Sequence, residues 1–101
     1  MNQENIGKFI AELRKEKNMT QQELADKLMI TDRAISHWEN GRRLPDLSLI
    51  SLVANELDVS VAELLNGRKL NKKELEELKT TIDKLLEYNT VEEIKKKQYI
   101  N

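Results

Sequence analysis

The chain has 101 residues, with 17 basic and 18 acidic side chains, one histidine and no cysteine. This composition excludes disulfides and thiolate metal sites and offers too little imidazole for a histidine cluster, so we predict no cofactor, no metal and no enzymatic activity. The formal net charge of −1 argues against a nonspecific coat on nucleic acid, but a specific reader needs only a local positive face. Without a membrane-length apolar run or a signal peptide, we expect a cytoplasmic protein that has no membrane contact.

The first two-thirds of the chain contain five segments that have the apolar spacing or the start signals of helices. The expected helices cover residues 6–17, 21–28, 32–39, 46–57 and a short stretch that ends at Asn66. Thr20 with Glu23, and Ser60 with Glu63, have the spacing of capping boxes. The apolar residues that the fourth segment offers to the core are Leu47, Ile50, Leu52, Val53, Ala54 and Leu57. Together these features predict a compact all-α domain over residues 1–69.

Residues 70–101 form a predicted helical extension. A helix is expected over residues 71–88, followed by a break near Asn89 and a short final helix. Its apolar residues fall at spacings of 3, 4 and 3, a two-heptad stripe made of Leu75, Leu78, Ile82 and Leu85. The stripe has three interpretations: pairing with a second copy, folding back on the same chain, or binding a protein such as an antirepressor. We favour a dimerisation segment, because a helix of balanced charge gains little unless it packs.

The predicted helix over residues 32–39 has two contrasting faces. Ile35 and Trp38 share the face that a core requires, and we expect Trp38 to be buried there. The candidates for contact with DNA bases lie on the other face and are Asp32, Arg33, Ser36 and His37. Arginine donates two hydrogen bonds to guanine, aspartate accepts from cytosine, and serine or histidine does either. A solvated polar surface explains this face equally well until its flanking residues are considered.

The flanking residues favour a nucleic-acid surface. Arg42 and Arg43 directly follow the helix, where two cations would meet phosphates. Gln21 and Gln22 open the preceding helix, where side-chain donors lie next to backbone amides that also favour phosphate. The full set of candidates for phosphate contact is Gln21, Gln22, Thr31, Asn40, Arg42 and Arg43.

Residues 6–67 resemble the helix-turn-helix domain of the Xre family, which includes the lambdoid phage repressors and Cro. The segments TQQELADKL, ISHWENGRRLPD and LDVSVAELLNG carry the resemblance. It implies a five-helix, lambda-repressor-like fold, double-stranded DNA as the partner, and base contacts centred on Asp32, Arg33 and His37. It also implies that Arg14 and Glu39 form an ion pair that ties the first helix to the third.

The chain departs from this family at Met29, where members usually have glycine in the turn between the second and third helices. If the turn keeps a positive φ at this position, a residue other than glycine costs about 1 kcal/mol. The alternative is a small adjustment of the turn, which would change the tilt of the following helix.

Three functions remain open at this point. The leading hypothesis is a sequence-specific transcriptional regulator, a homodimeric repressor that reads an inverted repeat through its third helix in the major groove. The second is a protein-interaction module, such as an antitoxin whose C-terminal helices bind a toxin. The third is a helical protein of the same fold without DNA activity, which the acidic pI of about 5.9 would suit.

Overall fold

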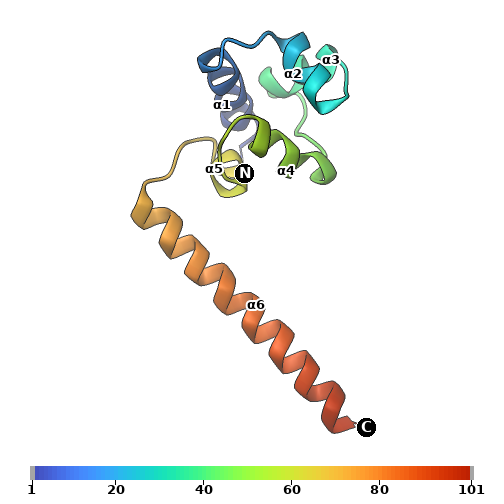
Figure 1. The fold of residues 1–101 in the computed structure, drawn as a ribbon, viewed down its shortest axis with the longest axis vertical. Helices are drawn as coiled ribbons and strands as arrows, with labels where there is room; N and C mark the ends of the chain where they lie inside the picture. The colour runs from blue at the N-terminus through green and yellow to red at the C-terminus, as the bar shows by residue number, and fades with distance from the viewer. Residues whose placement is uncertain (1, 101) are drawn as a thin grey trace. The chain divides into compact units, whose positions relative to one another are not determined.

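The computed structural model describes the backbone of residues 2–100 and the side chains of residues 2–86. Every regular element in the described range is a helix (Figure 1), which confirms the predicted all-α fold. By its contacts the chain divides into two units, residues 1–69 and residues 70–101. Within the described range, no helix combines the length and the apolarity that crossing a membrane would require.

The first unit contains five short helices. They are α1 (Gln3–Glu16), α2 (Gln21–Leu28), α3 (Asp32–Glu39), α4 (Leu47–Glu56) and α5 (Val61–Asn66). The bounds of α2 and α3 are those predicted, because both starts carry a side-chain cap: Thr20 bonds the backbone of Glu23, and Thr31 that of Ala34. α1 begins earlier than predicted. Its first turn is polar and has no apolar spacing that would reveal it, but the side chain of Asn2 caps it.

The core of the first unit lies between the apolar faces of all five helices. It consists of Ile6, Phe9, Ile10, Leu13, Leu24, Ala25, Leu28, Ile35, Trp38, Ile50, Val53, Ala54, Leu57 and Leu64. Two residues expected in this core are outside it, since Leu47 is 91% exposed and Leu52 is 52% exposed. Leu47 is the first residue of α4 and lies at the margin of the core, whereas Leu52 is on the face opposite Ile50.

Gly7 allows α1 and α3 to approach closely. A Cβ atom at this position would lie 2.1 Å from the carbonyl oxygen of Trp38 and 3.0 Å from that of Glu39. Real Cβ atoms do not approach backbone oxygens so closely, so only glycine lets the backbone of α1 pass the last turn of α3. The position of α3 therefore depends on a residue in the middle of α1.

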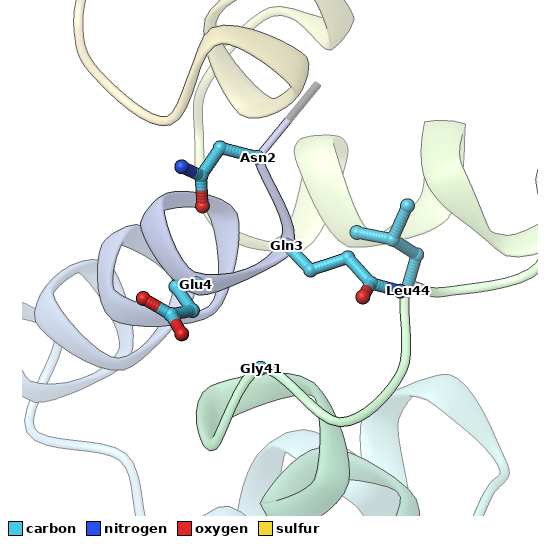
Figure 2. A pocket seen from close by; sticks show the side chains of 5 residues that line it. All are labelled: Asn2, Gln3, Glu4, Gly41 and Leu44. Atoms are coloured by element: carbon cyan, nitrogen blue, oxygen red, sulfur yellow. The ribbon is translucent and has the colours of Figure 1, made fainter.

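The loop after α3 also meets α1. Gly41 has a φ of 71°, and a Cβ atom there would lie 3.1 Å from the Cγ of Glu4. Figure 2 shows Gly41 facing the first turn of α1, where Asn2, Gln3, Glu4 and Leu44 line an open pocket with it. α1 thus contacts both the end of α3 and the loop that follows it.

The second unit is built on one long helix, α6 (Lys72–Ile100). Its start is capped by Asn71, whose side chain accepts from the backbone of Glu74 at 2.8 Å while the Glu74 carboxylate accepts from the backbone of Asn71 at 3.2 Å. The break predicted near Asn89 is absent, and the helix continues through that residue. Asparagine costs a helix less than 1 kcal/mol, roughly, whereas a proline would have stopped it.

Candidate nucleic-acid interface

The helix-turn-helix consists of α2, a tight turn at residues 29–30 and α3. Met29 ends α2 in the left-handed conformation, with φ 58° and ψ 41°. The N–H of Ile30 donates to the carbonyl of Ala25 at 3.0 Å and closes the turn. The Met29 side chain is 91% exposed, so packing does not offset the backbone strain of about 1 kcal/mol. The turn therefore keeps its left-handed geometry without a glycine.

An ion pair joins α1 to the last turn of α3. Arg14 donates to the two carboxylate oxygens of Glu39, from Nε at 2.6 Å and from Nη2 at 2.8 Å. The third donor of the guanidinium, Nη1, bonds the carbonyl oxygen of Met19 at 2.8 Å. The two side chains are only 10% and 6% exposed. The hydrogen bond to Glu39, opposed by burial and aided by its charge, raises the pKa of Arg14 above its usual value.

Gln21 extends this pair to a third helix. Its Nε2 donates to the Oε1 of Glu39 at 3.1 Å, so the first residue of α2 is bonded to the last residue of α3. This bond uses one of the two amide hydrogens of Gln21, and the other hydrogen and the amide oxygen take no part in it. We call Arg14, Glu39 and Gln21 the orienting network, because together they connect α1, α2 and α3.

The two faces of α3 are separated as the helical spacing requires. Ile35 is fully buried and Trp38 is 4% exposed, so Trp38 is a core residue, as predicted, and does not present its ring to solvent. Asp32 and Arg33 are exposed at the start of the helix, and Ser36 and His37 are half-buried one turn later. The four side chains proposed to contact bases thus come from one short helix whose opposite face is fixed in the core.

The residues proposed to contact phosphate have different surroundings. Besides Gln21, three of them already bond within the chain: Gln22 donates to Asp26 at 2.7 Å, the Thr31 hydroxyl accepts from the α3 backbone at 3.2 Å, and Asn40 donates to Ser36 at 3.3 Å. Each keeps at least one hydrogen for a further bond: the amides of Gln22 and Asn40 have two hydrogens, and the Thr31 hydroxyl acts only as an acceptor.

Three arginines give this side of the first unit a local positive charge. Arg33, Arg42 and Arg43 are all exposed, and within the described part of the chain their side chains have no hydrogen-bond or ion-pair partner. Two exposed acids lie near them, Asp32 next to Arg33 in the chain and Asp46, which lines a pocket with Arg43, whereas the charge of Glu39 is neutralised by Arg14. Among residues with described side chains, no cluster of histidine, aspartate and glutamate could hold a metal ion. The surface is suited to binding an anion.

Comparison with known proteins places the segment that contains α2 and α3 in a protein family. A helix-turn-helix family model matches residues 10–64. YqaE of Bacillus subtilis, an uncharacterised transcriptional regulator, is 41% identical over 70 residues, which are 69% of this chain and 60% of YqaE. The immunity repressor of Bacillus phage phi105 is 31% identical over 91 residues, 90% of this chain and 62% of the repressor. The transcriptional activator BcrR of Enterococcus faecalis is 36% identical over 61 residues, 60% of this chain and 30% of BcrR.

Solved structures share the fold. SinR, a master regulator for biofilm formation solved in complex with DNA, is 38% identical with a TM-score of 0.54, and the match covers 59% of this chain and 97% of that one. The clp gene regulator ClgR of C. glutamicum is 28% identical with a TM-score of 0.60, over 66% of this chain and 86% of that one. This chain spans less than two thirds of the three curated relatives named above. The chain belongs to the Xre-type family of helix-turn-helix transcriptional regulators.

Proposed function

We propose that this protein is a sequence-specific repressor that binds duplex DNA as a homodimer, with one α3 helix in the major groove of each half of an inverted repeat. The observation that carries the proposal is the geometry of α3. Its inner face is held by the core and by the orienting network. Its outer face presents four polar side chains, Arg33 among them, and two further exposed arginines follow the helix. A rigid helix of this kind is what direct reading of base edges requires.

The relatives support the parts of this proposal differently. SinR has been solved with DNA, and the phi105 protein is an immunity repressor, so both agree with a DNA-bound repressor. BcrR is named an activator, so repression is the part of the proposal that rests on fewer relatives. The assignment of Arg33 to bases and of Arg42 to phosphate comes from their positions, one in the first turn of α3 and one after its end.

Replacing each of the two arginines should weaken DNA binding in a different way. Arg33→Ala is expected to weaken binding to the preferred sequence by about 1–3 kcal/mol and to relax the preference at one base pair of each half-site. Arg42→Ala is expected to weaken binding to all duplexes alike and to reduce the slope of log affinity against log salt by about one unit. Titrations of each variant against a preferred and a scrambled duplex, at several salt concentrations, measure both effects. Equal losses on both duplexes for Arg33→Ala would contradict its role in base reading.

A homodimer is proposed because one recognition helix reads too few base pairs for genomic specificity, whereas a two-fold dimer reads two half-sites. The apolar stripe of α6 supports it: Leu78 is 37%, Ile82 46% and Leu85 57% exposed. Three neighbouring large apolar side chains on one helix face favour burial against a partner.

Disrupting the stripe should separate the subunits without unfolding the first unit. Ile82→Asp is expected to shift the full chain from dimer to monomer in sedimentation. It should also weaken operator binding at least tenfold, because the apolar burial lost at the pairing surface is worth about 1.4 kcal/mol, which corresponds to a factor of ten. Thr80→Asp is the matched control, because Thr80 lies on the opposite face of α6 and should leave the mass unchanged. A wild-type chain that sediments as a monomer would remove the dimer and direct attention to a different protein on the stripe, such as an antirepressor or a toxin.

A further inference from the structure

The stripe of α6 has a heptad frame that determines more than dimerisation. Leu75 and Ile82 occupy a positions, and Leu78 and Leu85 occupy d positions, over a continuous helix. A β-branched residue at a, with leucine at d, is the combination that favours two parallel strands. Ile82 with its neighbours Leu78 and Leu85 has this combination at the centre of the stripe.

We propose that a second copy of this chain pairs along α6 in parallel and in register, which deepens the proposed homodimer and rests on it. In a parallel pair each a residue meets the same a residue of the other copy, and each d residue meets the same d residue. Ile82 then packs on Ile82 of the second copy, and Leu78 on Leu78. In an antiparallel pair over the same stripe, Leu78 would instead pack on Ile82.

The charged residues beside the stripe distinguish the two orientations. In this frame Glu74 is at g and Lys79 is at e. Parallel pairing places g of one helix beside e of the following heptad in the other, so Glu74 lies beside Lys79 of the second copy, and the contact occurs twice. Antiparallel pairing over the same stripe places Lys79 beside Lys79 of the second copy, a contact between like charges. The charge pattern is complementary only in the parallel arrangement.

The cap at the start of α6 is compatible with this pair. Glu74 accepts the backbone N–H of Asn71 through Oε1. A carboxylate has two oxygens and about four acceptor sites, so Glu74 is able to hold its cap and to meet a lysine of the second copy.

The second pair of flanking residues favours the same orientation. Thr81 is at g and Leu86 at e, and Leu86 is 60% exposed. Parallel pairing places Leu86 beside Thr81 of the second copy, whose methyl group extends the apolar seam. Antiparallel pairing would place it beside Lys72, whose ammonium group requires water. The Thr81 hydroxyl donates to the carbonyl of Glu77 at 3.0 Å, so its polar atom has a partner within its own helix.

The orientation has a consequence for DNA reading. Each first unit precedes its α6, so in a parallel pair both first units leave the paired helices from the same end. The two recognition helices are then tethered to each other. Once one of them binds a duplex, the other meets the same duplex at a high effective concentration. A seam of two heptads is short, so the tether and the DNA contribute jointly to the affinity of the complex.

Cysteine variants of the full chain report the orientation, because the native chain has no cysteine. Leu78→Cys is expected to form an intermolecular disulfide with itself under mild oxidation, since d residues face each other in the parallel pair. Thr80→Cys, on the outer face, is the control and should remain reduced. Cross-linking that occurs in a mixture of Leu78→Cys and Ile82→Cys, but not in Leu78→Cys alone, would show an antiparallel pair and overturn the inference while leaving the homodimer in place.

A charge reversal tests the same inference without oxidation. Lys79→Glu is expected to weaken dimerisation about tenfold, because two attractive pairs with Glu74 become repulsive. Lys84→Glu makes the same charge change at a c position, outside the seam, and should leave the dimer constant unchanged. An antiparallel pair would respond differently, because Lys79→Glu merely exchanges one like-charged contact for another. A wild-type chain that is monomeric at every concentration would remove the proposed homodimer and this inference together.

Discussion

Replacing Glu39 with alanine is expected to lower the free energy of unfolding by about 3–5 kcal/mol, because it leaves the Arg14 guanidinium buried without its counter-charge. Arg14 is 9% exposed, so water cannot replace the carboxylate easily. Two of the three guanidinium hydrogen bonds end on Glu39, and only the one to the Met19 carbonyl remains in the variant. Gln21 loses its acceptor as well. Urea denaturation of the full chain, followed by circular dichroism, measures the loss.

The double variant Arg14→Met, Glu39→Leu is the control for this result. It removes both charges and keeps apolar volume in their place, so we expect it to recover most of the stability lost in Glu39→Ala. Its affinity for DNA should stay low, because the orienting network is gone even though the core is intact. A double variant as unstable as Glu39→Ala would show that packing, rather than the orphaned charge, causes the loss.

Gly7→Ala is the second substitution with a large expected effect. The new methyl group would lie 2.1 Å from the Trp38 carbonyl oxygen, so α1 and the end of α3 must move apart. Overpacking of this kind costs about 1–3 kcal/mol. Alanine's better helix propensity returns up to about 1 kcal/mol of that. We expect a net loss of stability, and weaker DNA binding even at temperatures where the variant is fully folded, since the recognition helix is displaced.

Lys8→Ala is the matched control, because it changes the next residue of α1 on its exposed face. Its stability should stay within about 0.5 kcal/mol of the native chain and its DNA affinity should change little. Thermal unfolding and duplex titration of the two variants side by side compare the effects. If Gly7→Ala were as stable as the native chain, the close passage of α1 over α3 would not limit the fold.

Local signals in the sequence were enough to predict the helices that form the candidate site. Thr20 and Thr31 mark the starts of α2 and α3, and the spacing of Ile35 and Trp38 identifies the inner face of α3. These features depend on hydrogen bonds and periodicities that span a few residues, so they can be read from a short segment. The choice of outward residues on α3 follows directly from that inner face.

Features that depend on distant backbone were not predicted. The need for glycine at position 7 arises from carbonyl groups in α3, and no pattern within α1 indicates it. The bond from Gln21 to Glu39 likewise depends on how α2 and α3 cross. Leu47 was assigned to the core by its spacing, but it is 91% exposed, and the core reaches α4 only at Leu49 and Ile50. Helix crossing and the limits of a core are properties of the assembled unit.

We propose that α3 of this protein reads the sequence of duplex DNA. The most direct test is selection of duplexes bound by the full chain from a random pool, followed by sequencing. We predict enrichment of an inverted repeat whose half-sites lie about 10 base pairs apart, centre to centre, or a multiple of that spacing. A pool that remains random after several rounds of selection, from a chain shown to be folded, would contradict the claim.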